Sequence, residues 1–112
     1  LERHAVGVLR LLGPALGRAP TEFAHALNAL DLYLATPREI AVVGPPESEV
    51  ARAALEPFDP NTVVAFGPAD GVPLLEGKDL VDGRPAVYVC ERFACKAPAT
   101  EPGELAVALS AK

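Results

Sequence analysis

Methionine and tryptophan are absent from this sequence of 112 residues, and only two cysteines, two tyrosines and four phenylalanines are present. A core therefore has to be built mainly from alanine, valine and leucine. Two cysteines are too few for the disulfide scaffold of a small secreted domain, so a reducing cytoplasm is the expected location. Because the chain has no methionine and opens at Leu1 inside an apolar pattern, we expect it to be part of a longer protein.

Positive charge and long apolar runs are also scarce. The net charge is −5, whereas binding to nucleic-acid phosphates relies on clustered lysine and arginine. No stretch approaches the roughly 18 consecutive apolar residues of a membrane span, and no signal-peptide pattern is visible. We therefore expect neither a nucleic-acid nor a membrane partner. Half of the residues are hydrophobic, which is typical of a globular protein.

The apolar pattern of residues 1–36 predicts a helical hairpin. One stripe recurs about once per turn and is interrupted at Gly13-Pro14, and a second recurs at helical spacing after Pro20. Further leucines lie off both stripes, so the hairpin is apolar on more than one side. The stripes comprise Val6, Leu9 and Leu12, then Phe23, Leu27, Leu30 and Leu34, and the extra leucines are Leu11, Leu16 and Leu32.

Residues 37–112 predict a small α/β domain. "EIAVVG" (39–44), "TVVAF" (62–66) and "AVYVC" (86–90) are short apolar runs typical of buried strands. "ESEVARAALEPF" (47–58) has helical spacing and completes a βαβ unit, and Thr100 is the expected N-cap of a last helix. The predicted fold is α/β: an N-terminal helical hairpin followed by a three-layer unit with a mainly parallel three-stranded sheet.

Cys90 and Cys95 are candidates for a disulfide, a redox centre or a metal site. If residues 90–95 stay extended, the two Cα atoms lie about 16 Å apart, too far for a disulfide. The C-x4-C spacing is not that of thioredoxin-like redox motifs, and a zinc site lacks further nearby ligands. We therefore expect both side chains to fill space, with Cys90 buried. A redox or thiol-exchange module, which requires a sharp turn through Arg92 and Phe93, is the alternative.

The turn from Gly44 to Ser48 is a candidate for binding a small ligand or anion, because a strand, a glycine and a helix start can form a phosphate cradle. Two prolines there remove backbone donors, and Glu47 and Glu49 add negative charge. Neither a dinucleotide-binding nor a Walker motif is present. We assign no catalytic, cofactor-binding or metal-binding residue.

Three segments together resemble one family: "FAHALNALDLYL" (23–34), "REIAVVGPPES" (38–48) and "LLEGKDLVDGRPAVYVCERFACKAPATEPGEL" (74–105). They are similar to the C-terminal end of the thioredoxin-domain-containing proteins of the YyaL / spermatogenesis-associated type. The most specific part of the resemblance is its ending, although Arg92 stands where a small polar residue is expected. The residues that form this fingerprint, with a structural role, are Tyr88, Cys90, Phe93, Cys95 and Pro98.

The resemblance implies a larger protein. Its members begin with a thioredoxin-like domain and continue into an α/α toroid resembling that of N-acylglucosamine 2-epimerase and of six-hairpin glycosidases. Residues 1–36 would then be the end of the toroid and residues 37–112 a C-terminal domain. We expect a non-catalytic accessory domain without cofactor, whose partner is the remainder of the same polypeptide. Self-association of the chain could cover the same apolar surface.

Overall fold

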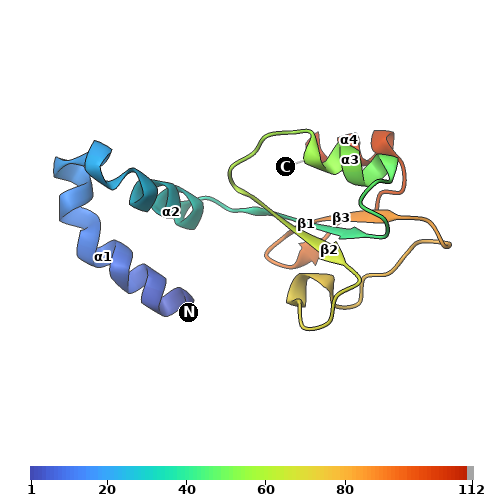
Figure 1. Cartoon of the computed structure of the whole chain (residues 1–112), viewed down its shortest axis with the longest axis horizontal. Helices are drawn as coiled ribbons and strands as arrows, with labels where there is room; N and C mark the ends of the chain where they lie inside the picture. Colours follow the sequence, from blue (N-terminus) through green and yellow to red (C-terminus); the bar gives the residue numbers. More distant parts are fainter. Residues whose placement is uncertain (111–112) are drawn as a thin grey trace. The chain divides into compact units, whose positions relative to one another are not determined.

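A computed structural model describes residues 1–110 of the chain (Figure 1). Close contacts divide it into two compact units, Leu1–Thr36 and a second one that begins at Pro37. Helices form the first unit, and a sheet with helices forms the second. The α/β class with an N-terminal helical hairpin is thus confirmed. None of the helices described is long and apolar enough to cross a membrane.

The helical unit consists of α1 (Glu2–Arg18), the short 3-10 helix η1 (Pro20–Phe23) and α2 (Ala24–Leu34). The expected break at Gly13-Pro14 is wrong, because α1 continues through Pro14 for another turn. A proline removes one backbone donor from a helix but does not have to end it. Leu16 is the one buried hydrophobic residue of the described part of this unit.

The α/β unit contains four strands, not three, in the order β2-β1-β3-β4. β1 pairs in parallel with β2, but in antiparallel with β3, which itself pairs in antiparallel with β4. The sheet is therefore mixed, and only the βαβ part of the expected parallel arrangement is present. The elements are β1 (Arg38–Val43), α3 (Glu49–Leu55), β2 (Thr62–Gly67), η2 (Pro73–Leu75), β3 (Ala86–Glu91), β4 (Ala94–Cys95) and α4 (Pro102–Ser110).

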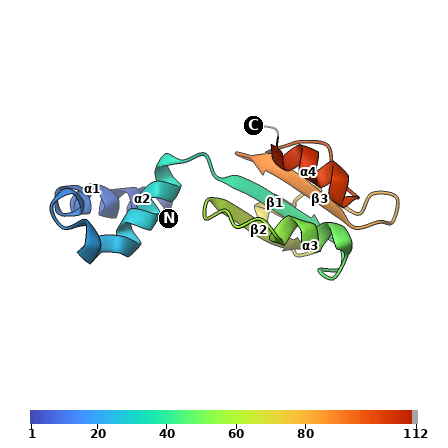
Figure 2. The same cartoon turned by 90° about the horizontal axis from the view of Figure 1, so that it is seen from above.

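Both helices of the α/β unit cover the same face of the sheet (Figure 2). Alternate residues of β1 and β3 point toward α3 and α4, as the two-residue period of a strand requires. The opposite face carries a smaller cluster, in which Leu74 and Leu75 of η2 pack on Ala41 and Cys90. The buried residues of the larger cluster are Ile40, Val42, Val50, Ala51, Ala54, Val87, Val89, Ala99 and Leu105.

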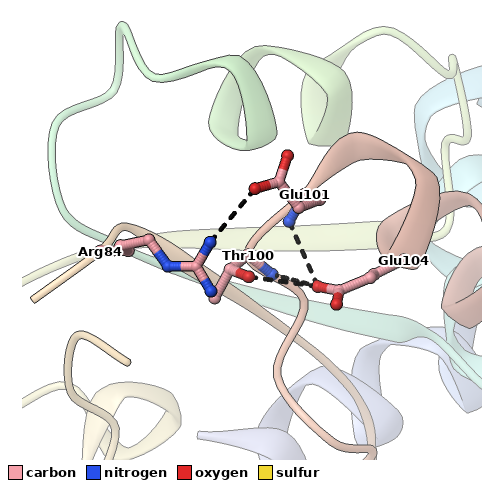
Figure 3. A network of polar contacts seen from close by, with 4 residues as sticks. All are labelled: Arg84, Thr100, Glu101 and Glu104. Carbon is pink, nitrogen blue, oxygen red and sulfur yellow. Dashed lines mark hydrogen bonds and ion pairs between the residues drawn. The ribbon is translucent and has the colours of Figure 1, made fainter. Parts of the chain in front are cut away.

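Polar contacts define where the last helix begins (Figure 3). One oxygen of the Glu104 carboxylate accepts hydrogen bonds from the backbone amides of Thr100 and Glu101 and from the Thr100 hydroxyl. Arg84 forms an ion pair with Glu101 at 3.2 Å. The backbone hydrogen bond from Thr100 is the main reason why the pKa of Glu104 lies below its ordinary value. Thr100 therefore precedes the helix by two residues and is held by a side chain inside it.

Candidate functional site: the Cys90–Cys95 hairpin

Four of the five fingerprint residues lie on the tight hairpin that β3 and β4 form, namely Tyr88, Cys90, Phe93 and Cys95. Glu91 pairs with Ala94, so the loop between the strands has two residues, Arg92 and Phe93. Both have a positive φ, of 49° and 62°. That combination is the one a type I′ turn requires, although asparagine and glycine usually occupy it. The hairpin is therefore closed by two bulky residues in a backbone conformation that L-residues rarely adopt.

A disulfide joins Cys90 to Cys95 across this hairpin. The two residues are direct cross-strand partners, and their Cα atoms lie 4.0 Å apart. The expectation of two unbonded, space-filling thiols is thus wrong. The physical reason is that residues 90–95 are not extended, because the turn at Arg92 and Phe93 brings the two ends together.

The two cysteines differ in their exposure to solvent. Cys90 is 1 % exposed and packs in the cluster beneath η2, as expected for a buried residue of a strand. Cys95 is exposed, on the outermost strand of the sheet. A reagent in solution therefore has access to Cys95 and not to Cys90.

Glu39 fixes the turn from the neighbouring strand. It is the cross-strand partner of Cys90 on β1, and its carboxylate accepts a hydrogen bond of 2.7 Å from the backbone amide of Phe93. The Phe93 side chain itself is 61 % exposed. The tip of the hairpin thus presents an exposed aromatic ring on a backbone held by a disulfide and by one carboxylate.

The segment after the disulfide is tied independently to the rest of the unit. The backbone amide of Lys96 donates to the Val89 carbonyl, and Ala99 exchanges two backbone hydrogen bonds with Val87. The Lys96 ammonium group donates to the carbonyl of Ala108, in the last turn of α4. A cation at the carboxyl end of a helix is favourable, because the helix dipole is negative there.

The two remaining fingerprint residues are Tyr88, which lies on β3, and Pro98, which lies in the segment after β4. The Tyr88 hydroxyl donates to the Asp79 carbonyl at 2.8 Å, and the Lys78 ammonium group lies 6.0 Å from the centre of its ring. Pro98 is exposed in the segment that leads to Ala99. Tyr88 also packs against the cluster that contains Cys90, whereas Pro98 borders a surface segment.

A hollow of about 290 Å³ opens at the carboxyl ends of the parallel strands β1 and β2. This edge is where ligands bind in many open α/β sheets. The charged side chains that line it are Asp70, Glu76, Lys78 and Asp79, so negative charge exceeds positive charge. Most of its lining comes from residues 67–79, whose sequence carries no ligand-binding motif.

The turn from Gly44 to Ser48, the candidate for binding an anion, is shaped by close packing and by a helix cap. Gly44 has a φ of 116°, and a Cβ at this position would lie 3.0 Å from the Cβ of Pro85. The glycine therefore allows close packing of two chain segments. The Ser48 hydroxyl accepts from the amide of Ala51 and so caps α3 itself. Within residues 1–110, no group of three or more potential ligand residues is placed to hold a metal ion.

A second surface with a distinct character lies on the helical unit. An apolar groove of about 490 Å³ runs between α1 and α2. It is bordered by one charged residue, Glu2, and is otherwise lined by apolar side chains and one tyrosine: Ala5, Val6, Val8, Leu9, Leu12, Ala26, Ala29, Leu32 and Tyr33. Within the same unit, Leu11 and Leu34 are 80 % and 74 % exposed.

Comparison with known proteins agrees with the resemblance at a coarse level. The chain is 27 % identical over 111 residues to spermatogenesis-associated protein 20 of Rattus norvegicus, and 26 % identical to that of Mus musculus. Each alignment covers 89 % of this chain but only 14 % of the relative. No family model matches the chain, and no solved structure matches it. The chain is therefore similar to a small part of these much longer proteins.

Proposed function

We propose that the chain is a non-catalytic accessory domain of a longer, cytoplasmic thioredoxin-domain-containing protein, with its helical unit belonging to an α/α toroid. The observation that carries this proposal is the apolar groove between α1 and α2. The similarity to a 14 % portion of spermatogenesis-associated protein 20 supports it, because most of such a protein lies outside the matched region.

The energetics of the helical unit indicate that the groove has an occupant. Helices as short as α2, with 11 residues, are marginal in water unless an apolar face is packed against something. Because Leu16 is the one buried hydrophobic residue of the described unit, α1 and α2 provide little of this packing for each other. Contiguous apolar surface of this kind marks an interaction site. The proposed occupant is the remainder of the same polypeptide, through further helices of the toroid.

Thiol labelling at a groove position tests this proposal. Tyr33→Cys places a thiol in the groove, and Arg10→Cys places one on an exposed residue of α1 that does not line it. In the 112-residue chain we expect a maleimide to label both variants rapidly. In the longer protein we expect labelling to slow by about tenfold or more at position 33 and to stay rapid at position 10. Mass spectrometry of peptides locates the label.

The oligomeric state of the chain provides a second measurement. A chain whose groove lacks its occupant should associate with itself at high concentration, and Tyr33→Glu should weaken this association because it buries a charge. Sedimentation velocity measures both. A chain that stays monomeric at high concentration, together with equal labelling of position 33 in the short and long proteins, would contradict the proposal.

A further inference from the structure

We propose that the Cys90–Cys95 disulfide is a site of reversible thiol–disulfide exchange with a dithiol, and that Cys95 is the sulfur attacked first. This function is independent of the docking of the helical unit. It rests on the difference in exposure between the two cysteines and on the way the hairpin is held. Exchange begins when a thiolate reaches one sulfur of a disulfide, so access decides which sulfur reacts.

Access favours one order of events. Cys95 is exposed at the edge of the sheet, while Cys90 is 1 % exposed beneath η2. An incoming thiolate therefore forms a bond with the sulfur of Cys95. The bond between the two cysteines breaks, and Cys90 leaves with the electron pair and takes up a proton.

The second thiol of the dithiol completes the exchange. As a thiolate it attacks the reagent's own sulfur in the mixed disulfide, and Cys95 leaves as a thiolate that takes up a proton. In sum, the hairpin gains two electrons and two protons, and the dithiol is oxidised to a disulfide. The reverse sequence, with an oxidised dithiol, closes the hairpin again.

The structure limits what opens when the bond is broken. The turn holds Arg92 and Phe93 at positive φ, a conformation that is unfavourable for L-residues. With the disulfide gone, the hydrogen bond from Phe93 to Glu39 is the remaining side-chain restraint seen on this turn. The chain after the turn stays attached through Lys96 and Ala99, which bond to β3 without the sulfurs. Reduction therefore loosens the exposed Phe93 and the short strand β4, while the end of β3 stays paired with β1 and the sheet persists.

The proposed cytoplasmic location gives this bond a functional meaning. In a reducing compartment, disulfides are rare, and those present are usually transient and either catalytic or redox-sensing. A disulfide with one exposed cysteine is among those that a thiol in solution reduces readily. The mobility of the Phe93 side chain and its turn then depends on the redox state of the surroundings.

Reduction of the native chain tests the proposal. The 112-residue protein is incubated without denaturant with dithiothreitol, or with a small redox protein that carries a Cys-X-X-Cys pair at the same dithiol concentration, and is then alkylated and analysed by mass spectrometry. We expect both cysteines to become alkylated while the circular dichroism of the sheet is retained, and oxidised dithiothreitol to restore the disulfide. Faster reduction by the protein assigns a protein source of the dithiol, and faster reduction by dithiothreitol assigns a small-molecule source. Reduction by neither until denaturant is added overturns the proposal.

Two single variants identify the attacked sulfur. Cys90→Ser leaves Cys95 as the free thiol, and Cys95→Ser leaves Cys90. With oxidised glutathione, we expect the first variant to form the mixed disulfide at least tenfold faster than the second, while both keep the circular dichroism of the wild type. Equal rates in folded variants overturn the assignment of Cys95. If either variant unfolds, peptide mapping locates the mixed disulfide that glutathione forms on the wild-type chain. A mixed disulfide on Cys90 also overturns the assignment of Cys95.

Discussion

Gly44 shows how one residue can determine the path of the chain between two elements. It follows β1, has a φ of 116°, and lies against Pro85, which precedes β3. A Cβ here would approach Pro85 to 3.0 Å and the Leu80 side chain to 3.2 Å. Both the backbone conformation and the space therefore require glycine at this position.

We expect Gly44→Ala to lower the free energy of unfolding by about 2 kcal/mol or more, because the added methyl group meets backbone and proline ring atoms. The matched control is Gly103→Ala in the first turn of α4, where a Cβ meets nothing within 4 Å. Alanine is the better helix former there, so the control should be neutral or up to about 1 kcal/mol more stable. Urea titrations of both variants measure the difference. Equal stability of the two variants would contradict this account of Gly44.

At the scale of the elements, the β3–β4 hairpin combines an unfavourable turn with a cross-link. Arg92 and Phe93 occupy positions that asparagine and glycine would fill at lower cost. Residues kept in such conformations concentrate at functional sites, where surrounding structure holds them. In this hairpin the disulfide and Glu39 provide that restraint.

Replacing Arg92 and Phe93 by the residues that a type I′ turn prefers should reduce the backbone strain of the hairpin. We expect the double variant Arg92→Asn with Phe93→Gly to raise the free energy of unfolding by about 1 kcal/mol, with the gain from the backbone partly offset by the loss of the Phe93 side chain. Ala97→Gly, at an exposed position without a positive φ, is the control and should be neutral or destabilising. Chemical denaturation under oxidising conditions measures all three proteins. A double variant less stable than the wild type would show that Phe93 contributes packing that outweighs its backbone strain.

At the scale of the whole molecule, the two units differ in how much core each contains. Of the sixteen buried hydrophobic residues among those described, Leu16 belongs to the helical unit and the others to the α/β unit. Part of the apolar surface of the helical unit instead lines its groove, and Leu11 and Leu34 are exposed outside it. The α/β unit therefore has the larger driving force to fold by itself.

We expect a chain of residues 37–112 to fold without the helical unit. Its far-ultraviolet circular dichroism should show a mixed helix and sheet spectrum, and its thermal unfolding should be cooperative because the sheet and both helices share one core. The matched control is a peptide of residues 1–36, for which we expect weak helicity in water. Cooperative unfolding of the peptide alone would contradict the proposal that its groove needs an occupant.

Several features of this protein follow from the sequence alone. Helical spacing indicates the hairpin of residues 1–36, because it reflects one apolar face of each helix. Continuous apolar runs indicate β1, β2 and β3, because a strand covered on both faces buries consecutive residues. Burial of Cys90 follows in the same way from its place at the end of an apolar strand. The last helix was also expected, although it begins two residues after Thr100.

Tertiary structure alone decided the features that depend on long-range pairing. The antiparallel direction of β3 beside β1 and the addition of β4 are settled by hydrogen bonds between residues far apart in the sequence, which a local apolar pattern does not encode. The turn at Arg92 and Phe93 carries none of the residues that usually mark a tight hairpin, so its disulfide was missed. Local patterns determine which residues are buried, whereas the bond between the two sulfurs depends on a chain reversal that only the folded sheet holds in place.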